Sequence, residues 1–187
     1  MAENSCLNGQ TNSINQVRYG CALGALHSVV AIPGAMPITH CGPGCVDKQY
    51  TSLAFYNGFQ GGGYAGGSVT PSVNAGEREV IFGGENMLRE LIKASLRILD
   101  AELFVVLNGC IGEIVGDDIG SVVGEFQRQD IPIVYADTGG FKGNNFIGHE
   151  IIVESIINQY VDKFAENKDV KEKGLININV KLIKVKK

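Results

Sequence analysis

The chain has 187 residues, of which 44% are hydrophobic and 19% are charged, and it contains 25 glycines. This length and composition predict a single α/β domain large enough to bury a hydrophobic core. A formal net charge of -4 gives no electrostatic basis for wrapping a polyanion, which excludes nucleic acid and anionic membranes as partners. No apolar run approaches the roughly 20 residues of a membrane span. The first residues, MAENSCLNGQ, lack a basic leader, so we expect a cytoplasmic protein.

The first part of the chain combines a polar arm with a short helix and a strand. Residues 1–20 are polar and without periodicity, and we expect an N-terminal arm that orders against a neighbour. Residues 22–32 are apolar on every side and predict a short buried helix, which Pro33-Gly34 ends. A strand follows at 36–40. Residues 41–45, Cys-Gly-Pro-Gly-Cys, are expected to form a turn outside any regular element.

The middle of the chain is rich in glycine before it becomes regular. Residues 50–64 can begin as a helix, but glycines dominate the second half, and we expect no element over 61–75. The segment EVIFGG at 79–84 predicts a short strand. Residues 85–99 predict a helix with an apolar face that includes Leu88 and Ile92.

The rest of the chain alternates buried strands and helices. Apolar runs at 103–107 and 131–136 are typical of strands covered on both faces of a parallel sheet. Helices are predicted at 117–128 and 146–165, and 175–185 alternates like a strand. This order predicts a doubly wound, mostly parallel sheet between two helical layers, Rossmann-like in type. We expect one such domain over residues 21–187.

Three of the five cysteines lie where open α/β sheets gather their chemistry. Cys45 and Cys110 follow predicted strands, and Cys21 precedes the first helix, where a thiolate is favoured by the backbone dipole. Each has a glycine directly before it: Gly20, Gly44 or Gly109. Spacing alone leaves two interpretations open, a metal ligand or a small core residue. No Cys-x-x-Cys pair is present, which disfavours a zinc ribbon.

Four segments of the sequence resemble the nitrogenase component 1 family, over about residues 18–160. They are Gly20-Cys21, Ile-Thr-His-Cys-Gly-Pro-Gly-Cys at 38–45, Phe-Gly-Gly-Glu at 82–85 and Gly-Cys-Ile-Gly-Glu-Ile-Val-Gly-Asp-Asp at 109–118. The resemblance implies that Cys21, Cys45 and Cys110 ligate a 4Fe-4S or P-cluster-like iron-sulfur cluster. Three ligands do not close a four-iron cluster. The resemblance therefore also implies a similar partner subunit, in a homo- or hetero-oligomer, that shares the cluster.

Other residues near these cysteines have two interpretations each. His40 either donates a hydrogen bond to a cluster sulfide or is structural. Cys41 stands where relatives usually have glycine, and is either an alternative ligand or a small residue. Glu113, Asp117 and Asp118 form a carboxylate group for metal or proton transfer, or cap helices.

The glycines at 61–67 do not make a phosphate loop, so we do not expect this chain to bind ATP. The resemblance instead implies a separate nucleotide-binding iron protein that delivers electrons. Three hypotheses follow: the electron-transfer part of an oxidoreductase, a scaffold for metallocluster assembly, or a binding or regulatory module without a cluster. Because the family's later domains are absent from this sequence, we do not expect a complete enzyme, and no catalytic residue or substrate is assigned.

Overall fold

The fold is seen in a computed structural model that describes residues 20–56 and 70–164. Its strands form a parallel sheet with β2 between β1 and β3. All six residues of β2 are buried, as expected for an apolar run covered on both faces. The register aligns His40, Asn108 and Asp137, so the carboxyl ends of the strands lie level at one edge. The strands are β1 (Ala35–His40), β2 (Leu103–Asn108) and β3 (Ile133–Asp137).

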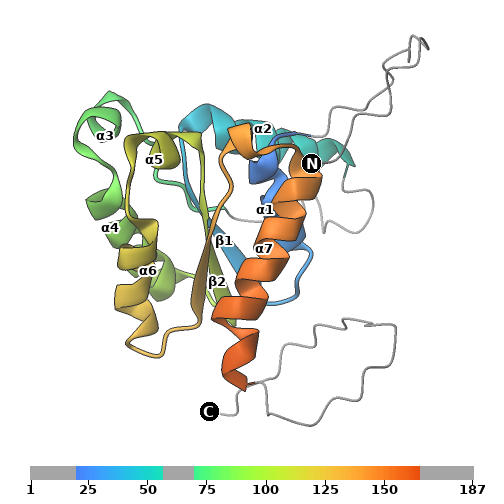
Figure 1. Cartoon of the computed structure of the whole chain (residues 1–187), viewed down its shortest axis with the longest axis vertical. Helices are drawn as coiled ribbons and strands as arrows, with labels where there is room; N and C mark the ends of the chain where they lie inside the picture. The colour runs from blue at the N-terminus through green and yellow to red at the C-terminus, as the bar shows by residue number, and fades with distance from the viewer. Residues whose placement is uncertain (1–19, 57–69, 165–187) are drawn as a thin grey trace, which may run out of the picture.

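Helices cover both faces of this sheet (Figure 1). α4 and α6 lie together on one face, whereas α1 and α7 pack against each other and against the sheet on the opposite face. This arrangement confirms the predicted three-layer α/β fold class. The helices are η1 (Ala22–Gly24), α1 (Ala25–Val30), α2 (Pro43–Tyr56), α3 (Glu77–Phe82), α4 (Glu85–Ile98), α5 (Cys110–Val115), α6 (Ile119–Gln127), η4 (Gly140–Lys142), α7 (Asn145–Gln159) and η5 (Val161–Phe164).

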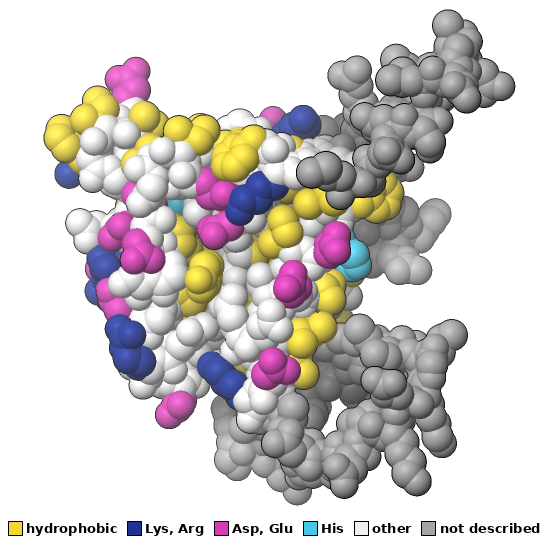
Figure 2. Space-filling view, viewed as in Figure 1, with side chains coloured by type: hydrophobic (Ala, Val, Ile, Leu, Met, Phe, Trp, Pro, Cys, Tyr) yellow, Lys and Arg dark blue, Asp and Glu magenta, His cyan; other side chains and the backbone are white. Residues whose placement is uncertain are grey.

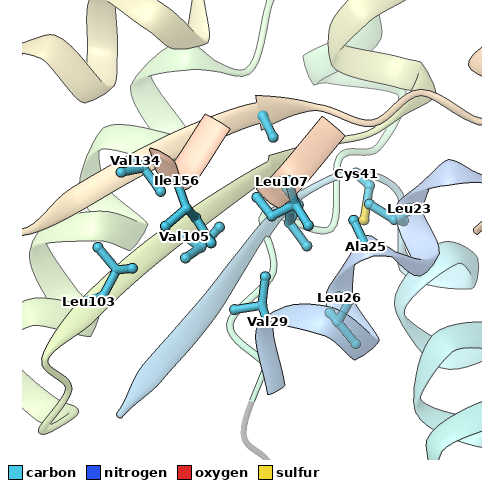
Figure 3. Packing of buried hydrophobic residues seen from close by; sticks show 12 residues of the cluster. Leu23, Ala25, Leu26, Val29, Cys41, Leu103, Val105, Leu107, Val134 and Ile156 are labelled. Carbon is cyan, nitrogen blue, oxygen red and sulfur yellow. The ribbon is translucent and has the colours of Figure 1, made fainter. Parts of the chain in front are cut away.

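The side chains of β2 divide the core into two clusters. Leu103, Val105 and Leu107 belong to the cluster under α1 and α7, and Figure 3 shows Val105 beside Ile156 of α7. Phe104 and Val106 belong to the other cluster, under α4 and α6. This alternation is the period of two that a strand imposes on its side chains, and it anchors the sheet to both helical layers.

The prediction of a turn outside any element at 41–45 is wrong for its second half. Pro43, Gly44 and Cys45 form the first turn of α2. Proline suits the first position of a helix because the N–H that it lacks has no partner inside the helix there. Cys45 is therefore held on a helix. α2 continues to Tyr56. Of the stretch 61–75 that was predicted to hold no element, residues 61–69 lie outside the described residues, and residues 70–75 form no helix or named strand.

The predicted strand at 79–84 is also wrong, because this segment is the helix α3. The Glu79 carboxylate accepts a hydrogen bond from the Gly76 N–H at 2.9 Å, which satisfies a backbone donor at the start of the helix. The apolar side chains of this segment are exposed, with Ile81 at 70% and Phe82 at 81%. Figure 2 shows apolar side chains gathered at this end of the molecule. The second short helix, α5, was not predicted.

Two predicted segments lie outside the described residues: the N-terminal arm, which contains Cys6, and the final strand at 175–185. The remaining predicted helices and strands are confirmed within a few residues at their ends. Among the helices of residues 20–56 and 70–164, none is both long enough and apolar enough to cross a membrane.

Side chains close the outer edge of β3. The Gln159 amide from the end of α7 accepts from the Tyr135 N–H at 3.0 Å and donates to the Tyr135 carbonyl at 2.7 Å. Gln127 donates to the Ile133 carbonyl at 2.8 Å. These amides replace the backbone of a neighbouring strand, so the edge offers few free groups for pairing with another chain.

Candidate functional site

Three cysteines gather at the carboxyl edge of the sheet. Cys45 lies in the first turn of α2, Cys110 is the first residue of α5, and Cys21 directly precedes η1. Gly140, just beyond β3, marks the point between two of them. A Cβ atom on Gly140 would lie 3.2 Å from the Cys110 Sγ and 3.4 Å from the Cys21 Sγ. A side chain at this position would therefore occupy the space that the sulfur atoms face.

The start of α7 fixes the position of Cys21. Cys21 forms an isolated antiparallel bridge with Asn144, and the Asn145 N–H donates to the Gly20 carbonyl at 3.1 Å. Below these contacts, η1 packs directly on the helix backbone. A Cβ on Gly148 would lie only 2.0 Å from the Ala22 carbonyl oxygen. The glycine therefore permits the close approach that sets Cys21 against β3 and η4.

Backbone groups on both sides hold Cys110. The Gly109 N–H donates to the His40 carbonyl at 2.9 Å, which extends the pairing of β1 with β2 by one residue. The Cys110 Sγ accepts a hydrogen bond from the Gly140 N–H, with 2.9 Å between nitrogen and sulfur. Cys110 is thus positioned by one contact from β1 and one from the loop after β3.

Cys45 is half-buried and lies close enough to the other two cysteines to interact with their charges. Burial raises the pKa of the Cys45 thiol, and electrostatic repulsion from Cys110 and Cys21 raises this pKa further. Cys110 and Cys21 therefore both lie within electrostatic range of Cys45. A positive charge placed among them, such as a metal, would offset this repulsion.

Cys41 differs from these three cysteines because it is fully buried. Figure 3 shows its sulfur atom in the core beside Leu23 and Ala25. Burial raises the pKa of the Cys41 thiol to about 11. A Cβ on Gly109 would lie 2.7 Å from the Cys41 Cβ, so the missing side chain of Gly109 accommodates Cys41. These contacts favour the interpretation of Cys41 as a small core residue.

His40 takes part in a buried network on the other side of the sheet. Its Nε2 atom lies 2.7 Å from an Asp117 carboxylate oxygen, and the same carboxylate accepts from the Gly84 N–H at 3.0 Å. The ring also packs on Gly112, where a Cβ would lie 2.4 Å from the His40 Cδ2. These contacts tie β1 to α4 and α5. They favour a structural role for His40 over a hydrogen bond to a cluster sulfide.

The three carboxylates of the 109–118 segment serve three separate structural purposes. Asp117 joins the His40 network, and Asp118 caps α6 by accepting from the Ser121 N–H at 2.8 Å. Glu113 accepts from the Gly139 N–H and pairs with Lys142 at 2.8 Å. These contacts favour capping and positioning over a shared metal or proton-transfer site.

No three His, Cys, Asp or Glu side chains within 20–56 and 70–164 are arranged to hold a single metal ion. Ligands of a cluster bind different metal atoms, so they stand further apart than the ligands of one ion. The thiols of Cys21 and Cys110 on either side of Gly140, with an N–H donor to the Cys110 sulfur and Cys45 within electrostatic range, suit such a group. Gly140 and Lys142 were missed from the sequence, where only the Gly-Gly pair after a buried strand marked them.

The sequence matches the family model of the nitrogenase component 1 type oxidoreductase over residues 21–182. Its curated relatives include a nitrogenase molybdenum-iron protein beta chain of Rippkaea orientalis, 26% identical over 80% of this chain and 29% of the relative. A nitrogenase iron-molybdenum cofactor biosynthesis protein, NifE, of the same organism is 24% identical over 85% of this chain and 34% of the relative. The chain spans about a third of the length of these relatives.

The fold is also similar to that of solved nitrogenase structures. A structure titled "Nitrogenase Cp1 at pH 6.5" matches with a TM-score of 0.68 and 20% identity, covering 83% of this chain and 33% of the solved chain. A second structure, at pH 5, matches with a TM-score of 0.62 and 26% identity over 74% of this chain and 29% of that chain. The similarity thus extends over most of the present domain and a third of the solved chains.

Proposed function

Because this chain belongs to the nitrogenase component 1 type oxidoreductase family, we propose that Cys21, Cys45 and Cys110 bind part of an iron-sulfur cluster used for electron transfer. The observation that carries the proposal is the convergence of the three thiols at one edge of the sheet. Gly140 leaves the space between Cys21 and Cys110 open. Cys45 lies close enough to both that their charges raise its pKa.

The chain's own residues hold and shield the group. Cys45 and Cys110 lie in the first turns of α2 and α5, and Cys21 directly precedes η1. The buried core beneath them limits access of water from the protein side. When bound, an iron-sulfur cluster accepts and passes on electrons at a potential set by its surroundings. Cluster assembly requires reduced thiols, which the cytoplasm maintains, and the proposal places the protein there.

The proposal also includes partners. Three thiols leave a four-iron cluster short of a ligand, and all three are partly exposed, so a second, similar chain can supply the missing ligand. The beta-chain names of relatives are consistent with such an assembly. A nucleotide-binding iron protein is the proposed electron donor. This chain covers about a third of the length of its relatives, and the proposal assigns no substrate site to it.

Assembly of a metallocluster is the second candidate function. A relative named as a cofactor biosynthesis protein matches 85% of this chain, more than the 80% matched by the beta chain of the same organism. The same three cysteines would then hold a cluster for transfer to another protein. A binding or regulatory module of this fold without a cluster is the third.

Anaerobic purification with iron and sulfide analysis and EPR tests the cluster. We expect iron and sulfide in the wild type and a loss of most of both in Cys21→Ala, Cys45→Ala and Cys110→Ala. Cys41→Ala is the matched control, because its thiol is a buried neighbour of the site, and it should keep its iron. Equal iron content in all four variants would refute the ligand assignment.

Electron transfer and assembly make different predictions for the loaded protein. An electron-transfer domain should be reduced by an added iron protein and ATP, and should keep its iron during repeated turnover. A scaffold should lose its iron to an acceptor protein that lacks its cofactor. Transfer without reduction by the iron protein would favour the scaffold.

A further inference from the structure

The side chains of Glu113 and Lys142, called the Glu113 clamp below, contact the loop whose Gly140 N–H donates to the Cys110 sulfur. Cys110 and Glu113 lie one turn apart on α5, so they share a face of the helix. They accept hydrogen bonds from consecutive amides, Glu113 from the Gly139 N–H and Cys110 from the Gly140 N–H. The position of the second bond therefore depends on the first.

Lys142 fixes the same loop from its other end. Its Nζ atom lies 2.8 Å from the second Glu113 oxygen and donates to the Asp137 carbonyl at 2.9 Å. The Glu113 side chain is only 12% exposed and the Lys142 side chain 32%. This partial burial distinguishes the pair from an exposed ion pair, which contributes little. The Glu113 clamp thus contacts the loop on both sides of Gly140, at the Gly139 N–H through Glu113 and at the Asp137 carbonyl through Lys142.

The hydrogen bond from the Gly140 N–H changes the electron density of the Cys110 sulfur. An N–H donor withdraws electron density from a cysteine sulfur, and hydrogen bonds to the sulfur atoms are among the factors that set the reduction potential of a cluster. Neither Glu113 nor Lys142 touches the sulfur. Their effect acts through the backbone of Gly139 and Gly140.

We propose that Glu113 and Lys142 are positioning residues that hold the Gly140 N–H on the Cys110 sulfur and thereby raise the reduction potential of a cluster bound there. The potential part of this inference rests on the proposed function, whereas the clamp itself is a property of the chain. Glu113→Ala removes the acceptor for the Gly139 N–H and the partner of Lys142. Glu113→Gln keeps an oxygen acceptor but loses the charge, and Lys142→Met keeps the carboxylate.

The first measurement uses the full chain without metal. NMR hydrogen exchange of the Gly140 amide should be faster in Glu113→Ala by about tenfold, the factor expected when the Gly140 N–H loses its own hydrogen bond to the Cys110 sulfur. Glu113→Gln should restore part of the protection, and Lys142→Met should give an intermediate rate. Unchanged Gly140 exchange in folded Glu113→Ala would overturn the clamp. If that variant does not fold, the comparison of Glu113→Gln and Lys142→Met with wild type decides.

The second measurement is the midpoint potential of the iron-loaded protein. Glu113→Ala should shift it to more negative values, with the iron content unchanged. The matched control is Glu90→Gln, because Glu90 and Lys93 form an ion pair of the same 2.8 Å length on the exposed face of α4; it should change neither readout. Faster exchange with an unchanged potential would refute the effect on the cluster. Failure of the wild type to bind iron would refute the proposed function, while the exchange result would still decide the clamp.

Discussion

Gly148→Ala should destabilise the protein and displace Cys21. A Cβ on Gly148 would lie 2.0 Å from the Ala22 carbonyl oxygen and 2.8 Å from its carbon. Backbone atoms cannot rotate away, so η1 and α7 must separate. Overpacking of this kind costs about 3 kcal/mol at the upper end of its range, and the better helix propensity of alanine offsets about 1 kcal/mol. We expect a net loss of about 2 kcal/mol, measured by urea denaturation.

Gly124→Ala is the matched control, because Gly124 lies inside α6 and its added Cβ would meet only the end of Arg128, at an ordinary 3.5 Å. It should stabilise the protein by about 0.5 to 1 kcal/mol. The two Gly→Ala changes therefore have opposite expected signs. Equal stability of the two variants would refute the reasoning, as would full iron loading in a Gly148→Ala protein whose η1 has moved.

Three further predictions concern the folded chain. Burial raises the folded-state pKa of Cys41 to about 11, above its ordinary value of 9.0. The unfolded chain therefore loses this proton first, and the free energy of unfolding should fall by about 2 to 3 kcal/mol from pH 9 to 11. In urea denaturation, Cys41→Ala should lack this component, and parallel pH curves for the variant and the wild type would contradict the prediction. Asp118→Ala removes the acceptor for the Ser121 N–H and should cost about 1 kcal/mol in the same assay; a variant as stable as the wild type would contradict the capping role. Gln159→Ala frees the Tyr135 N–H and carbonyl and should increase self-association in sedimentation experiments; an unchanged monomer fraction would argue against edge closure.

Much of the fold was predictable because burial leaves a strong pattern in the sequence. The run Leu103–Asn108 is apolar at nearly every position, as a central parallel strand requires. In α4, Leu88 and Ile92 recur at helical spacing and are both fully buried. Asp118 was expected to cap a helix, and it does. In each case the structure favoured by the local sequence pattern is also the one that the tertiary contacts stabilise.

The errors arise where apolar residues are not buried or where an element is short. Ile81 and Phe82 are residue types that favour strands, yet they lie exposed on a helix of six residues. A short apolar run does not distinguish a strand from a helix. Pro43 was expected to lie in a turn because proline interrupts helices, but proline also suits the first turn of a helix, and α2 begins at this residue. The Glu113 clamp joins α5 to a loop 26 residues later in the chain, and no local pattern specifies such a contact.

Gly112 has a consequence for the electron-transfer proposal. A Cβ there would lie 2.2 Å from the Asn108 Oδ1 and 2.4 Å from the His40 ring, so α5 rests directly on side chains at the ends of β1 and β2. The helix that begins at Cys110 is thereby wedged between the sheet below it and the Gly139-Gly140 loop beside it. Close-packed interiors resist deformation. Under the proposed function, a Cys110 sulfur mounted in this way would move little when a bound cluster changed charge, and this would lower the reorganisation energy of electron transfer.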